Sequence, residues 1–151
     1  MVRVLLFSNL RNHFPLLTIL VFGIAITLLV PLLIPKQSLG KKGSDCCKWD
    51  GITCDWVTSH VIELDLSSSW LFGTIHSNTT LFPLPHLQRL NLAFNNFSGS
   101  SVSAGFGRFL SLTHLNLSNS AFSGLISPEI SHLSNLVSLD LSWNSNTEFA
   151  A

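Results

Sequence analysis

The chain has 151 residues, of which 11% are charged, and its eight basic and eight acidic side chains balance to a net charge of zero. This excludes a large field of one sign, so neither nucleic acid nor an anionic membrane surface is expected as an electrostatic partner. A typical soluble domain has about a quarter charged residues. The low charge, with leucines that recur through the second half, indicates a repeat array.

The first third of the chain contains an uncharged apolar run from Phe14 to Ile34, preceded by two arginines and a histidine. Transfer of such a run into a membrane is strongly favoured, so a hydrophobic helix that directs the chain into the secretory pathway is expected. About twenty apolar residues can span a bilayer, whereas the core of a cleaved signal is about 7–15 residues long. Residues 1–40 are therefore either a signal peptide or a signal anchor.

The sequence leaves both fates of this segment open. Ser38 and Gly40 place small residues two apart, which is compatible with cleavage before Lys41. If uncleaved, residues 14–34 would attach the protein to a membrane, although basic residues on both flanks do not fix its orientation. The cysteines and glycosylation sequons downstream favour export of the carboxyl side. The expected location is the extracellular space (apoplast) or the plasma membrane.

Three cysteines follow within nine residues: Cys46, Cys47 and Cys54. In an exported protein, three cysteines permit at most one internal disulfide, which leaves one cysteine as an unpaired thiol. Cys47 and Cys54 are close enough in sequence to bridge. The bridge would close a tight loop and leave Trp49 available to cover the first turn of the chain that follows. Three free buried thiols are the alternative.

An internal repeat is the strongest signal in the chain. Leu66, Leu92, Leu117 and Leu141 recur at intervals of 26, 25 and 24 residues. Apolar residues also occupy the positions two, five, eight and eleven residues before these anchors. They are Leu64, Leu90, Leu115 and Leu139; Val61, Leu87, Leu112 and Leu136; Leu84, Phe109 and Leu133; and Leu81, Phe106 and Ile130. A spacing of two predicts a short strand, and spacings of three predict a tight helical or irregular return.

The positions after each anchor repeat as well. Three residues after each anchor lies a small polar side chain that can form hydrogen bonds with backbone groups of the turning chain. Five residues after it lies an apolar side chain that fills the turn (a plug), and seven residues after it lies a glycine that permits a sharp turn. These columns are Ser69, Asn95, Ser120 and Asn144; Leu71, Phe97 and Phe122; and Gly73, Gly99 and Gly124. In the fourth copy Asn146 and Glu148 replace the last two, so that repeat is incomplete.

Together the columns predict an α/β-type solenoid over residues 61–151: a right-handed leucine-rich-repeat coil with short parallel strands and about four turns, preceded by the hydrophobic helix. One turn cannot bury both of its end faces, so stability must accumulate through stacking. Each fully buried Leu or Phe contributes roughly 1.5–3 kcal/mol. A Leu-rich helical fold is the weaker alternative.

The segment that contains the three cysteines resembles part of a known protein family. The segment from Asp45 to Cys54, with its Cys-Cys-x-Trp-x-Gly-hydrophobic-x-Cys pattern, resembles the amino-terminal cap of plant leucine-rich-repeat receptor-like proteins and receptor kinases, most closely the disease-resistance type. Residues 41–60 are thus a partial cap, since the family's cap is longer and has an earlier cysteine. The resemblance implies that Cys46 lacks that partner and stays unpaired, and that Cys47 bridges Cys54.

On the predicted strands, residues between the inward leucines face the open side of the sheet. The candidate ligand residues there are Glu63, Asp65, Arg89, Asn91, His114, Asn116, Ser138 and Asp140, with Ser67, Ala93, Ser118 and Ser142 beyond them. Solenoids present such concave faces to extended partners. The resemblance implies a protein or peptide ligand, in defence receptors a pathogen-derived one, and a co-receptor. Solvated polar positions without a ligand are the simpler alternative for any single residue.

Three glycosylation sequons begin at Asn78, Asn96 and Asn116, and the last would place sugar on the concave face. The six histidines occupy differing repeat positions, and we find no phosphate-binding Gly loop, zinc spacing or nucleophile motif. We therefore expect no enzyme, no metal and no cofactor.

The resemblance implies the ligand-recognition part of a plant defence receptor-like protein, here truncated. Two other functions stay open. One alternative is a soluble decoy or an inhibitor of secreted hydrolases, because the polygalacturonase inhibitors are related to this family. A non-functional remnant is the other, because the cap is incomplete.

Overall fold

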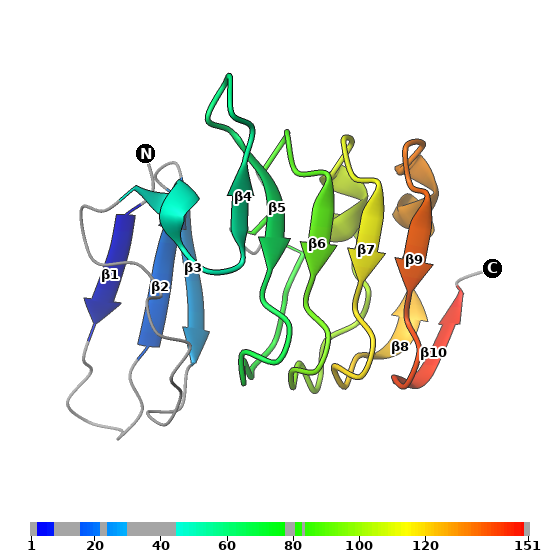
Figure 1. Cartoon of the computed structure of the whole chain (residues 1–151). Helices are drawn as coiled ribbons and strands as arrows, with labels where there is room; N and C mark the ends of the chain where they lie inside the picture. The colour runs from blue at the N-terminus through cyan, green and yellow to red at the C-terminus, as the bar shows by residue number, and fades with distance from the viewer. Residues whose placement is uncertain are drawn as a thin grey trace.

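The computed structural model describes residues 3–7, 16–21, 24–29, 45–77, 81–82 and 84–149. Most of these residues form a stack of coil turns whose short strands lie side by side on one face (Figure 1). Five strands make this sheet, in the order β4-β5-β6-β7-β9. Their bounds are Ile52–Cys54 (β4), Val61–Asp65 (β5), Arg89–Asn91 (β6), His114–Asn116 (β7) and Ser138–Asp140 (β9).

The repeat register is preserved in the sheet. Strands β5, β6, β7 and β9 are parallel, and the leucines two residues before the anchors face one another across them. β4 belongs to the cap and runs antiparallel to β5. Leu64, Leu90 and Leu115 are at most 4% exposed, and the anchors Leu92 and Leu117 at most 2%. The predicted leucine-rich-repeat coil with short parallel strands is confirmed.

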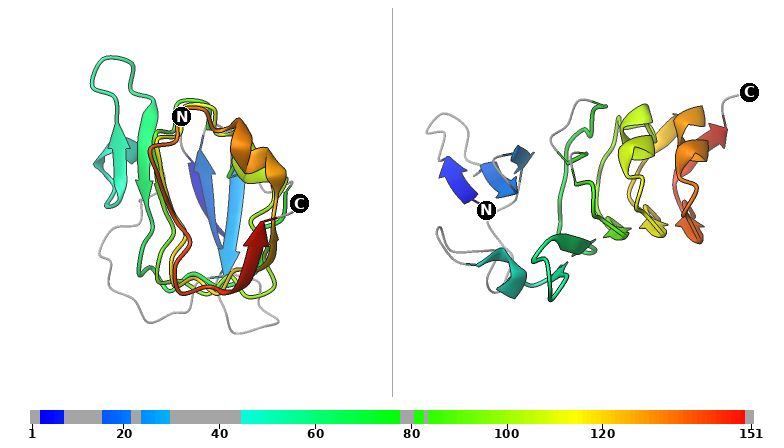
Figure 2. Two further views of the ribbon diagram at one scale, coloured as in Figure 1. Left: turned by 90° about the vertical axis from the view of Figure 1, so that its right-hand side faces the viewer. Right: turned by 90° about the horizontal axis from the view of Figure 1, so that it is seen from above.

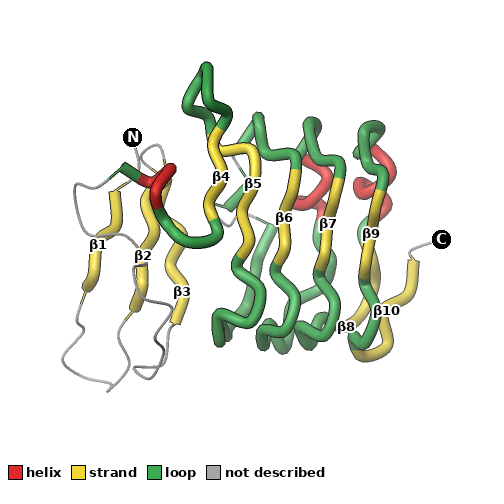
Figure 3. Tube along the Cα trace, viewed as in Figure 1, coloured by secondary structure: helices red, strands yellow, loops and turns green. Residues whose placement is uncertain are grey.

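The return segments lie opposite the sheet and close each turn, so that the turns superimpose when viewed along the stack (Figure 2). They contain the 3₁₀ helices η2 (Ala104–Arg108) and η3 (Pro128–His132), and the strands β8 (Ser123–Ile126) and β10 (Ser145–Phe149), which pair in parallel (Figure 3). Every helix in the described part of the chain is 3₁₀, so the α component of the predicted class is wrong there. Spacings of three suit a 3₁₀ turn, which is stable only in short runs.

Phenylalanines fill the space between sheet and return. Phe106, Phe109 and Phe122 are fully buried, and the rings of Phe106 and Phe122 meet edge to face with centroids 6.1 Å apart. Phe82 packs against Phe106 in the same way at 5.2 Å. In the last turn Leu139 and its neighbours in the inward rows are only partly buried, because each turn is covered by the next.

The polar column three residues after the anchors ties successive turns together. The Asn95 amide donates to the carbonyl oxygens of Leu66, Leu92 and Ala93 at 2.9, 2.8 and 3.2 Å, and its Oδ1 accepts from the Leu71 N–H at 2.9 Å. Asn144 repeats this pattern two turns later. The serines of the column make fewer bonds: Ser120 Oγ donates to Leu92 O at 2.7 Å. Backbone groups inside the coil are thereby satisfied.

The amino-terminal strands contradict one expectation. Arg3–Phe7 (β1), Leu16–Val21 (β2) and Ile24–Leu29 (β3) form a three-stranded antiparallel sheet, so the hydrophobic helix expected over residues 14–34 is wrong for their described parts. Among the described residues, no helix has the length and apolarity needed to cross a bilayer. Apolar runs of this kind do not distinguish strand from helix by periodicity, and β-branched residues favour pairing as strands.

Replacement of Asn95 by Ala should destabilise the fold by about 2–4 kcal/mol, since each lost hydrogen bond contributes about 1 kcal/mol and buried carbonyl oxygens lose their donor. Asn95→Ser should cost less, because serine occupies this column in two other turns. The exposed neighbour offers a control: Asn96→Ala should cost less than about 1 kcal/mol. Denaturant unfolding followed by tryptophan fluorescence measures all three. Equal destabilisation by Asn95→Ala and Asn96→Ala would contradict the assigned role.

Candidate ligand-binding face

Two rows of side chains run across the parallel strands on the face away from the leucines. We call them the first row, Glu63, Arg89, His114 and Ser138, and the second row, Asp65, Asn91, Asn116 and Asp140. Each row consists of residues that the sheet register places directly beside one another. Adjacent strands lie about 4.8 Å apart, so each row is about 14 Å long.

These eight residues, together with Leu90 and Leu115, line a single shallow hollow of about 280 Å³. They are the eight candidate ligand residues of the sequence prediction, and the structure brings all of them together. The arrangement follows from the two-residue period of a strand, which turns alternate side chains to opposite faces. Such a hollow can accept an extended segment laid across the strands.

The second row is fixed by its own backbone, which the sequence prediction missed. In each of its four members Oδ1 accepts a hydrogen bond from the N–H two residues on. The distances are 2.9 Å from Asp65 to Ser67, 3.1 Å from Asn91 to Ala93, 3.0 Å from Asn116 to Ser118 and 2.9 Å from Asp140 to Ser142. An Asp or Asn followed by a turn at the same place in every repeat is the signal that could have predicted it.

This turn also corrects the expected extent of the face. Ala93 and Ser118, expected to be displayed beyond the second row, are only 1% and 6% exposed. The chain bends inward after the second row. Of the next set of residues, Ser67, Ala93, Ser118 and Ser142, the two in the middle are therefore covered. The displayed surface is therefore the two rows, with Ser67 half-buried and Ser142 exposed at its two ends.

The hollow carries negative charge. Three carboxylates line it against one guanidinium, that of Arg89, which lies 3.9 Å from the Glu63 carboxylate. A hydrogen bond from the Ser142 hydroxyl and, to a smaller extent, one from the Ser142 N–H hold the pKa of Asp140 below its usual value. With neutral histidine the face has a charge of −2, in a chain whose net charge is zero.

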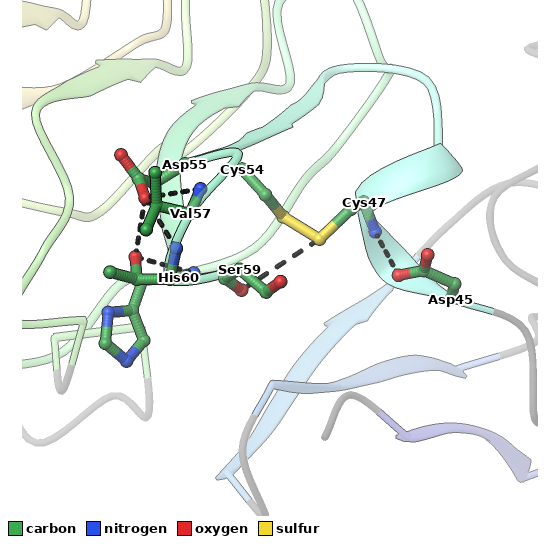
Figure 4. The surroundings of a disulfide bond; sticks show 8 residues. Asp45, Cys47, Cys54, Asp55, Val57, Ser59 and His60 are labelled. Carbon is green, nitrogen blue, oxygen red and sulfur yellow. Dashed lines mark hydrogen bonds between the residues drawn. A yellow bond between two sulfur atoms is a disulfide. The ribbon is translucent and has the colours of Figure 1, made fainter.

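The cap closes the end of the stack beside Asp65. Cys47 and Cys54 form a disulfide with their Cα atoms 5.4 Å apart, and the Asp45 carboxylate accepts from the Cys47 N–H at 3.1 Å, at the start of the 3₁₀ helix η1 (Cys46–Lys48) (Figure 4). Trp49 is 6% exposed within the core. Gly51 is required because its φ is +80° and a Cβ there would lie 2.0 Å from the Asp65 carbonyl oxygen.

Cys46 is a free, buried thiol. Burial, and secondarily the Asp45 carboxylate, raises its pKa. The sulfurs of Cys46, Cys47 and Cys54 lie within 4.8 Å of one another and are the one such group of potential metal ligands in the described residues. Since two of them form the disulfide, this arrangement is not a metal site.

The histidines occupy differing repeat positions, and the structure brings one pair of them into contact. The rings of His60 and His86 stack with centroids 4.0 Å apart, because successive turns bring residues about one repeat apart into contact. His114 lies in the hollow.

The sequons differ in their surroundings, and Asn78 lies outside the described residues. Asn96 is exposed and its Oδ1 accepts from the Ser98 N–H and hydroxyl. Asn116 is half-buried in the second row, where its Oδ1 accepts from the Ser118 hydroxyl at 2.7 Å. A glycan on Asn116 would extend from the floor of the hollow.

The burial of Cys46 predicts a thiol that is present but protected. A thiol-reactive dye such as Ellman's reagent should detect one thiol per chain in denaturant without reductant, and should react only slowly with the native protein because both burial and the raised pKa disfavour the thiolate. Cys46→Ala should abolish the signal. Three thiols in denaturant, or fast reaction of the native chain, would contradict the assignment.

Exposure predicts which described sequon is modified. In a eukaryotic secretory host we expect a glycan at Asn96 and little or none at Asn116, since Asn96 lies on an open turn and Asn116 is half-buried. Glycosidase release in heavy-oxygen water followed by peptide mass spectrometry reads the occupancy, with Asn96→Gln as the control. Occupancy of Asn116 alone would overturn this prediction.

Comparison with known proteins agrees with this geometry. A family model described as leucine rich repeat matches residues 85–145. Receptor-like protein 6 of Arabidopsis thaliana is 55% identical over 108 residues, which is 72% of this chain and 11% of the relative, and the Receptor-like protein Cf-9 homolog of Solanum lycopersicum is 55% identical over 68% of this chain and 12% of the relative. The chain thus spans about a tenth of the length of these curated relatives.

Among solved structures, the Arabidopsis receptor kinase HAESA in complex with the peptide hormone IDA and the co-receptor SERK1 is similar, with a TM-score of 0.59 and 34% identity over 71% of this chain and 17% of that one. The shared features are the stacked turns and the parallel sheet. Both curated relatives are receptor-like proteins. By sequence and by fold, this chain belongs to the leucine-rich-repeat part of the plant receptor-like protein family.

Proposed function

We propose that this chain is the amino-terminal part of the ligand-recognition array of a plant defence receptor-like protein, and that it binds a protein or peptide segment in the hollow. The observation that carries the proposal is that eight polar or charged side chains from four strands line one continuous hollow. Their positions are fixed by a buried stack, so little order has to be gained on binding.

The kind of ligand follows from the shape of the face and from its relatives. A row about 14 Å long fits some four to five residues of extended chain. The similarity to the HAESA ectodomain, which was solved with a peptide hormone and a co-receptor, supports a peptide or protein ligand and a co-receptor for this chain as well.

The extracellular location is part of the same proposal. The disulfide suits an oxidising compartment, and residues 1–40 would direct export, either as a cleaved signal or as an anchor through residues 14–34. The mass of the protein isolated from a secretory host separates these two fates.

A display experiment tests the binding role. A random peptide library is panned against the full chain made in an oxidising bacterial compartment, which adds no glycan. Recovered peptides should bind at the hollow, so His114→Trp, which fills it from an exposed position, should weaken binding at least about tenfold. Ser134→Trp, at an exposed position outside the hollow, is the matched control and should have no effect. Recovery of no binders, or of binders insensitive to His114→Trp, would refute the proposal.

A further inference from the structure

The charge along the second row is distributed in a way that points to a ligand class. Its two end members, Asp65 and Asp140, are carboxylates, and its two middle members, Asn91 and Asn116, are neutral amides. All four side chains hold the same backbone turn through Oδ1. The turn itself does not require the charge, because Asn serves equally well in the middle of the row.

The end carboxylates are not neutralised by the protein. The ion pair of the face joins Arg89 to Glu63 in the first row, and within the described residues neither Asp65 nor Asp140 has a basic side chain at ion-pair distance. A carboxylate offers about four lone-pair sites, so each can accept from a ligand in addition to its turn. The hollow thus presents two separated anionic points on an otherwise neutral row.

The spacing of these points matches an extended chain. Asp65 and Asp140 are three strands apart, about 14 Å at 4.8 Å per strand. An extended peptide rises about 3.4 Å per residue and turns every second side chain to the same face, so positions i and i+4 are also about 14 Å apart. The position between them, i+2, would lie over Asn91 and Asn116.

We propose that the hollow recognises an extended peptide segment with basic residues at positions i and i+4 and a polar or acidic residue at i+2. The basic side chains pair with Asp65 and Asp140, and the central residue meets the two amides. The carboxylates at the two ends of the row, with neutral amides between them, set the register. This inference rests on the proposed function and specifies its ligand.

The library selection on the full chain provides the test. Peptides recovered on the unmodified chain should be enriched in Lys or Arg at a spacing of four. The matched variant is Asp65→Asn with Asp140→Asn, which keeps the shape and the backbone hydrogen bonds, as Asn91 and Asn116 demonstrate. It should weaken binding of the selected peptides about three- to thirty-fold, as expected for two exposed ion pairs, and remove the enrichment.

A second variant moves the charge and leaves its amount unchanged. Adding Asn91→Asp and Asn116→Asp to the first pair of substitutions places the two carboxylates on adjacent strands, about 4.8 Å apart. The spacing of four should then disappear from the recovered peptides, and a single central Lys or Arg should be enriched in its place. Fold retention is checked by circular dichroism and by the unfolding midpoint.

The outcomes separate this inference from the function on which it rests. Peptides that bind at the hollow but show no spacing of basic residues, or the same spacing on all three proteins, would overturn the basic-peptide inference and leave the binding role intact. Failure to recover any peptide sensitive to His114→Trp would overturn both. Enrichment that follows the carboxylates from one variant to the next is the result that the inference predicts.

Discussion

The structure depends on one constraint, that every turn of the coil must satisfy its backbone polar groups while its leucines face the interior. The turns are too short for ordinary helices, so their carbonyl and N–H groups point partly into the core. The Asn95 side chain forms hydrogen bonds with four such groups from two successive turns. Stacking then buries the apolar rows, and neither effect suffices alone because an isolated turn has two open faces.

The candidate site is a consequence of that stack. Because the leucines are held in register, the residues between them are in register too, and four strands produce two straight rows of side chains. The Asx turns fix the second row further. A face built in this way changes its chemistry by single substitutions without altering its geometry, since Asp and Asn hold the same turn at neighbouring positions. Recognition and stability are thereby assigned to alternate residues of the same strand.

Much of this could be predicted from the sequence because the repeat period carries it. The anchor leucines, the Asn and Ser column, the plugs and the eight residues of the hollow all follow from position within a repeat. What the period does not encode was mispredicted. The helix expected over residues 14–34 rested on hydrophobicity alone, which does not distinguish helix from strand. The burial of Ala93 and Ser118 follows from the turn after the second row, whose Asp and Asn signal was not used in the prediction.

The central claim, that in-register stacking positions the face, is tested most directly by native-state amide hydrogen exchange measured by NMR. The N–H groups of Leu66, Leu92 and Leu117 donate to the next turn, to the carbonyl oxygens of Asn91, Asn116 and Asp140 at 2.8, 2.8 and 2.9 Å. If the stack is one cooperative unit, these three amides exchange slowly and with closely similar free energies of opening. Exchange at the rate of an unstructured peptide would contradict the account.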